Sequence, residues 1–187
     1  MIYKVLDDNK QFQSFHIDME EFLDVMDDAI GEVVAMQFSQ NNVELSPHWK
    51  PLKITYVQNE DCGDAIPDIG IWHGASLILS EKAINVLRPM IESYGEILLA
   101  TCEGKPHFIF NCRTLVDADE AQSKQMMSED YFMSVESLAF PASIEANLFK
   151  TPFENNQSSF CDDELKDAVE TNGLGGVYFG TDLTAFM

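Results

Sequence analysis

Residues 96–112 read EILLATCEGKPHFIFNC, and this stretch decides the fold. Two apolar runs flank the segment Glu103-Gly104-Lys105-Pro106, a pattern that predicts a β-hairpin. We expect Cys102 to face His107 across it. In that register one face carries Ile97, Leu99, Phe108, Phe110 and Cys112, and the other carries Leu98, Ala100 and Ile109. Because both faces are apolar, we expect the hairpin at the centre of a sheet that is covered on both sides.

Helices are expected on both sides of the hairpin in the sequence. Apolar residues recur at helical spacing over 18–30, with Asp18 as the N-cap and Gly31 at the end. A second helix is expected from Ser80 to about residue 87, where Pro89 ends or bends it. A third is expected from Asp162 or Asp163 to Gly173.

Strands and loops fill the remaining chain. Strands are expected at 2–6, 33–38, 53–57 and 177–179, together with an apolar stretch at 69–79 that Gly70 and Gly74 interrupt. We expect a polar loop at 59–64 and much loop over 119–155. Helices and strands interleave without strict alternation. This order predicts an α+β fold: a single compact domain over residues 1–187, with a mixed, mainly antiparallel sheet and flanking helices.

Composition limits the classes of partner. The 187 residues are 45% hydrophobic, enough for a core, and carry 32 Asp+Glu against 11 Lys+Arg, a formal net charge of -21. Such a field repels nucleic acid and anionic lipid, because phosphate contacts require Lys and Arg. We therefore expect no nucleic-acid partner and no membrane partner. A basic protein partner, or solubility alone, accounts for the charge.

The sequence favours a cytoplasmic protein. No apolar run is long enough to cross a bilayer, and the first eight residues lack the pattern of a secretory signal. The four cysteines, Cys62, Cys102, Cys112 and Cys161, form no Cys-x-x-Cys pair and are expected as free, buried thiols.

No pattern indicates catalysis. Cys102 and His107 would pair a thiol with a base, but neither an orienting third group nor a set of zinc ligands lies nearby in the sequence. Residues 117–120 (DADE) have the carboxylates for a divalent cation, yet a solvated turn is the more ordinary interpretation. The glycines at 173–176 follow a helix, whereas a phosphate loop precedes one. We predict no catalytic, cofactor-binding or metal-binding residue.

The acids of the first helix are the candidate binding residues. Seven acids and no base lie between Asp18 and Glu32, and most of them point away from the apolar face of the helix. The ordinary interpretation is a solvated face that maintains solubility. The functional interpretation is a negative patch that steers a basic partner, formed by Asp24, Asp27, Asp28 and Glu32 beside the loop acids Asp61 and Asp64.

Short phrases between residues 49 and 180 carry a family resemblance. They are WKP at 49–51, PDIG at 67–70, SLILSEKA at 76–83, VLRPM at 86–90, VDA at 116–118, FCDDELKDA at 160–168 and GLGGVYF at 173–179. This pattern resembles a family of bacterial immunity proteins from polymorphic toxin systems, of the contact-dependent and type VI secretion kinds. The resemblance implies a cytoplasmic protein that binds and neutralises a toxin made beside it, and it implies no catalytic residues.

The leading hypothesis is therefore an immunity protein that inhibits a cognate toxin by occluding a functional surface. A basic, nuclease-type toxin would fit the acidity, because an acidic inhibitor can mimic the charge of nucleic acid. Two alternatives stay open: an adaptor or chaperone that loads an effector, and a small carboxylate-dependent hydrolase. A homodimer also stays open.

Overall fold

The central hairpin has two apolar faces, and the rest of the fold packs against them. The computed structural model describes residues 1–58, 63–129 and 131–185, with the backbone alone at 27–29. The hairpin is formed by β6 (Gly95–Cys102) and β7 (Lys105–Cys112) and lies inside a six-stranded sheet of order β2-β3-β6-β7-β5-β4. The other strands are β2 (Ser14–Ile17), β3 (Leu52–Val57), β4 (Ile69–Trp72) and β5 (Ser76–Ser80). Neighbouring strands are antiparallel except β3 and β6, which run parallel.

The predicted register of the hairpin was wrong by two residues. Cys102 pairs with Lys105, and His107 pairs with Ala100. The connection is a two-residue turn in which Glu103 and Gly104 both have positive φ, 50° and 78°. Such turns match the twist of paired strands better than the longer loop we expected. Because side chains alternate with a period of two, this shift leaves every residue on its predicted face.

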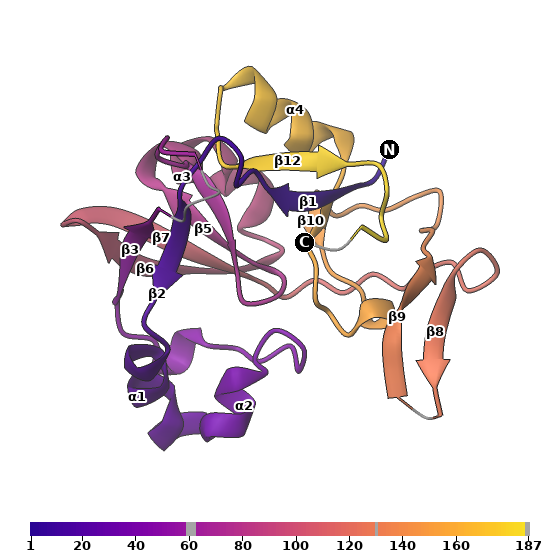
Figure 1. Cartoon of the computed structure of the whole chain (residues 1–187), viewed down its shortest axis with the longest axis horizontal. Coiled ribbons are helices and arrows are strands. Elements are labelled where there is room, and N and C mark those ends of the chain that lie inside the picture. Colours follow the sequence, from indigo (N-terminus) through magenta and orange to yellow (C-terminus); the bar gives the residue numbers. More distant parts are fainter. Residues whose placement is uncertain (59–62, 130, 186–187) are drawn as a thin grey trace.

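Layers cover both faces of the six-stranded sheet, as predicted. On one side α1 (Met19–Ile30) and α2 (Glu32–Met36) bury Phe22, Met26 and Ala35 against Leu98 and Ile109. The other side is covered by α3 (Glu81–Ile91), α4 (Asp163–Thr171) and a four-stranded sheet of order β10-β11-β1-β12. Its strands are β1 (Tyr3–Asp7), β10 (Leu148–Phe149), β11 (Phe160–Cys161) and β12 (Val177–Gly180). Figure 1 shows α1 and α2 on the opposite side of the molecule from α4 and β12. The α+β prediction is confirmed.

The strand predicted at 33–38 is wrong, because this segment forms α2. Gly31, with φ of 81°, separates α1 from α2, and the chain then turns helically again. Ala35 and Phe38 are fully buried three residues apart, whereas Val33 is 71% exposed. Burial of these two side chains outweighs the preference of the valines for a strand.

The helix predicted to end or bend near Pro89 continues to Ile91. Ser80 caps its start as predicted, accepting a hydrogen bond from the backbone N–H of Ala83 at 3.1 Å. Pro89 removes one backbone donor, but Leu87 and Ile91 are buried on the same face of α3. Packing of that face against the sheet stabilises the last turn.

The segment expected as loop at 119–155 contains a separate hairpin. It is formed by β8 (Lys124–Ser128) and β9 (Tyr131–Ser137), which pair only with each other in the described part of the chain. We call β8 and β9 the arm, and Figure 1 shows the arm at the edge of the molecule, away from α1 and the six-stranded sheet. The short 3-10 helix η2 (Pro152–Glu154) lies near it, and a second one, η1 (Ser46–His48), precedes β3.

Two further sequence predictions concern the polar loop at 59–64 and the expected lack of a membrane-spanning segment. Of the polar loop at 59–64, only residues 63 and 64 are described, so Cys62 and Asp61 lie outside the described residues. Within the described ranges, no helix combines the length and the apolar character that a membrane span requires.

Candidate functional site

The thiol–imidazole pair predicted across the hairpin is not formed as expected. The imidazole of His107 lies beside Tyr56 on β3, with 3.2 Å between its Nε2 and the phenol oxygen. Cys102 and His107 are both buried, at 1% and 4% exposure. Burial raises the pKa of the Cys102 thiol and lowers the pKa of the His107 imidazole, so burial favours the uncharged form of both groups. These are the properties of core side chains.

Of the six candidate acids, the structure describes the side chains of Asp24, Glu32 and Asp64, and Asp64 lies apart from the other two. Asp24 on α1 and Glu32 on α2 are exposed, while the side chains of Asp27 and Asp28 and the whole of Asp61 lie outside the described residues. Asp64 is exposed, and its backbone carbonyl accepts a hydrogen bond from the Gln13 side chain. Gln13 precedes β2, whereas α1 follows β2, so Asp64 and the helix acids lie beyond opposite ends of that strand.

Metal ligands show no grouping in the described ranges. No cluster of three or more His, Cys, Asp or Glu side chains stands there with a geometry suited to a metal ion.

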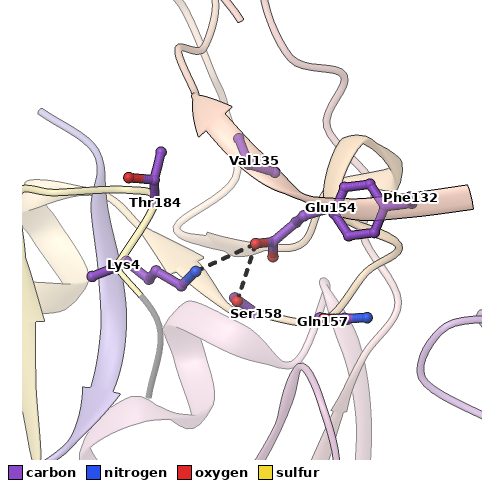
Figure 2. A pocket seen from close by; sticks show the side chains of 8 residues that line it. Lys4, Phe132, Val135, Glu154, Gln157, Ser158 and Thr184 are labelled. Atoms are coloured by element: carbon purple, nitrogen blue, oxygen red, sulfur yellow. Dashed lines mark hydrogen bonds and ion pairs between the residues drawn. The ribbon is translucent and has the colours of Figure 1, made fainter. Parts of the chain in front are cut away.

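A cavity that the sequence analysis did not predict lies between β1, η2 and the arm. It has a volume of about 200 Å³ and is lined by Lys4, Phe132, Val135, Glu154, Gln157, Ser158, Thr184 and Ala185. Figure 2 shows the Lys4 ammonium and the Glu154 carboxylate pointing toward each other, with Phe132 and Val135 of the arm beside them. The two charged groups are 3.4 Å apart, and both side chains are 7% exposed.

The chemistry of this cavity centres on Glu154. Its Oε2 accepts hydrogen bonds from the Lys4 ammonium and from the Ser158 hydroxyl, the latter at 3.2 Å. Its Oε1 is buried and has no hydrogen-bond partner among the described residues. Burial raises the pKa of Glu154, and the neighbouring Lys4 acts in the opposite direction. Glu154 is the one carboxylate among the described lining residues. A hydrolase that works by general acid and base carboxylates requires a second carboxylate beside the first.

A second buried cation joins other parts of the chain. The Lys150 ammonium is fully buried and donates a hydrogen bond to the backbone carbonyl of Ser39 at 2.7 Å. Burial lowers its pKa to about 8. Lys150 follows β10 and Ser39 follows α2, so this bond connects the two sides of the molecule. Both buried cations act as cross-links between segments far apart in the sequence.

Within the described residues, the arm carries a group of large, exposed apolar side chains. Met126, Met127, Tyr131 and Met133 are 52%, 49%, 73% and 58% exposed. Two residues attach the arm to the body: Val135 is buried, and the Gln125 amide donates to the backbone carbonyl of Phe153 at 2.6 Å. Exposed clusters of this kind mark interaction surfaces on soluble domains.

Comparison with models of protein families finds no family that matches this chain, and a search of curated proteins finds no match either. The resemblance to immunity proteins over residues 49–180 stays a prediction.

Proposed function

We propose that the protein binds a basic cognate toxin or effector domain and neutralises it by occluding a functional surface. The observation that carries the proposal is the excess of carboxylates on the surface of a chain with net charge -21. The sequence resemblance to immunity proteins supports the toxin as the kind of partner.

Several of the cations are paired with carboxylates or buried, and the acids of the chain still outnumber its bases by 21. Lys82 pairs with Asp68 at 3.0 Å, Lys124 with Glu136 at 2.6 Å, and Lys166 with Glu170 at 2.7 Å. Lys4 and Lys150 are buried. A surface with one dominant sign of charge accelerates encounter with a partner of the opposite sign and repels nucleic acid.

Co-expression tests the proposal. The gene of an immunity protein is expected directly downstream of its toxin gene, so the protein encoded directly upstream is the candidate partner. It is expressed in a bacterial host alone, with this chain, and with an unrelated acidic protein of similar size and charge. We expect growth arrest in the first and third cultures and growth in the second, together with a complex of the two proteins on gel filtration.

The same experiment separates the proposed function from an adaptor. An adaptor would form the complex without restoring growth. Equal growth arrest in all three cultures and no complex would show that the proposal is wrong.

A further inference from the structure

The arm presents two different faces. Met127 pairs with Phe132, and Gln125 pairs with Val135, so these four residues share the side that faces the body. Side chains alternate along a strand, so Met126 and Tyr131, which are adjacent to Met127 and Phe132, lie on the opposite side. Met133 follows Phe132 in the bulge that interrupts the pairing opposite Met126 and Met127, and its exposed side chain lies on that outer side too. We call Met126, Tyr131 and Met133 the outer face. Each of its three side chains is more than half exposed, at 52%, 73% and 58%.

A two-stranded hairpin with an apolar outer face is poorly stabilised by itself. Hairpins of two strands are marginal in water, and in the described residues neither β8 nor β9 has a second neighbouring strand. Here the inner face supplies the stability through Val135 and the Gln125–Phe153 hydrogen bond. The outer face contributes nothing to that attachment. Its methionines are adaptable apolar side chains, and tyrosine is enriched among residues that dominate binding energy.

The charge around the arm selects the kind of partner. The segment 117–137 contains six acids and one base, Lys124. Asp117, Glu120, Glu129 and Glu136 are exposed, and the single base is paired with Glu136 at 2.6 Å. A second copy of this chain would bring two negative arms together. A basic surface is electrostatically complementary to the arm, so the charge favours a basic protein over a homodimer.

We propose that the outer face of the arm is where the basic partner docks, through an apolar patch of its own bordered by Lys or Arg. This inference rests on the proposed function and assigns it a surface. Met126, Tyr131 and Met133 supply the apolar contact, and the exposed acids of segment 117–137, Glu129 among them, supply the surrounding negative charge. The candidate acids of α1 and α2 then steer the partner without forming the central contact.

Truncation of the outer face tests the proposal. The variant carries M126A, Y131A and M133A, and its control is Y178A, which removes an exposed aromatic ring from β12. Binding to the purified upstream protein is measured by biolayer interferometry. We expect the triple variant to bind roughly 30-fold more weakly or worse, mainly through faster dissociation, and the control to bind within about twofold of the wild type. Circular dichroism and urea unfolding confirm that both variants fold.

A matched pair at one position tests the charge of the partner. M133K and M133E remove the same apolar contact and introduce opposite charges on the outer face. Against a basic partner, the lysine variant should bind roughly tenfold more weakly than the glutamate variant at low salt. Weaker binding by M133E than by M133K would overturn the inference.

The outcomes distinguish the docking surface from the function. If the triple variant binds within about threefold of the wild type, the arm is not the docking surface, while the proposed function stands. If the wild-type protein itself neither binds nor neutralises the upstream protein, the proposed function is wrong and this inference is wrong with it.

Discussion

The carboxylate of Asp7, at the end of β1, accepts a hydrogen bond from the backbone N–H of Ile71 on β4 at 2.9 Å. This bond joins the four-stranded sheet to the six-stranded sheet. Burial raises the pKa of Asp7 to about 6, although the hydrogen bond from Ile71 favours the charged form. The contact between the two sheets is therefore sensitive to pH in the mildly acidic range.

Stability should fall as pH rises from about 4 to about 6. In that interval folded Asp7 retains a proton that unfolded Asp7, with a pKa near 3.8, has released. The folded state binds more protons, so rising pH favours the unfolded state. Asp7→Asn keeps an oxygen acceptor for Ile71 and removes the charge. We expect it to remove the Asp7 contribution to this fall and to be more stable than the wild type at pH 7 by about 1–3 kcal/mol.

Urea unfolding at pH 4.5 and pH 7 measures the effect. The control is Asp8→Asn, which removes the neighbouring charge without altering the Asp7–Ile71 hydrogen bond. This control should show the same fall in stability with rising pH as the wild type. An Asp7→Asn variant with an unchanged pH profile would show that Asp7 is not the group responsible.

The central hairpin should be the most sensitive part of the core. Phe110 is fully buried between Ile97 on β6 and Leu77 on β5, its partners in the sheet. Phe110→Ala should lower the free energy of unfolding by about 3–5 kcal/mol, because it removes a large ring and leaves a cavity. Leu99→Ala, on β6 of the same hairpin, is the control: Leu99 is 46% exposed, and its loss should change stability by less than about 1 kcal/mol. Denaturation curves of Phe110→Ala that overlay the wild type would contradict the assignment.

This hairpin shows which features the sequence predicts well. The faces of β6 and β7 followed from the alternation of apolar residues, and both the faces and the cap at Ser80 were predicted correctly. Of the two candidates for the cap of α4, Asp162 and Asp163, the structure shows Asp162. The exact register of the hairpin was not predicted, because it depends on whether Glu103 adopts a positive φ, which the sequence does not determine. Leu99 is apolar and on the predicted face, yet it is half exposed because the covering layer does not extend that far.

The candidate site was harder to predict than the fold. Lys4 and Glu154 are 150 residues apart, and no periodic pattern connects two charged residues at that separation. The arm was expected as loop because two bulges interrupt the alternation of its strands, between Lys124 and Gln125 and between Met126 and Met127. Its exposed methionines and tyrosine were visible in the sequence, but their exposure depends on tertiary packing.

The described cysteines should resist alkylation in the folded protein. Cys102, Cys112 and Cys161 are buried free thiols. Burial raises the pKa of Cys112 to about 11 and also raises that of Cys102 and Cys161. The reactive thiolate is therefore scarce at pH 7.5. Iodoacetamide should leave these three unmodified over a time that labels them fully in urea, as peptide mass spectrometry would show. Labelling at equal rates in both conditions would contradict their burial.

The acids of α1 and α2 should govern how fast the basic partner is found. Changing Asp24, Asp27, Asp28 and Glu32 to amides removes four negative charges and leaves the buried Phe22 and Met26 untouched. Folding should barely change or improve slightly, because removing like charges along a helix relieves their mutual repulsion. Association with the upstream protein should slow roughly tenfold at low ionic strength, with little change in dissociation. At 1 M salt, where the Debye length is about 3 Å, the difference should largely disappear.

The control removes equal charge from the other side of the sheet, through amides at Glu81, Glu92, Glu164 and Asp167. It should slow association by about twofold or less. Equal slowing by both sets would mean that total charge steers the partner. An unchanged rate for the α1 and α2 set would leave these acids with a solvating role alone.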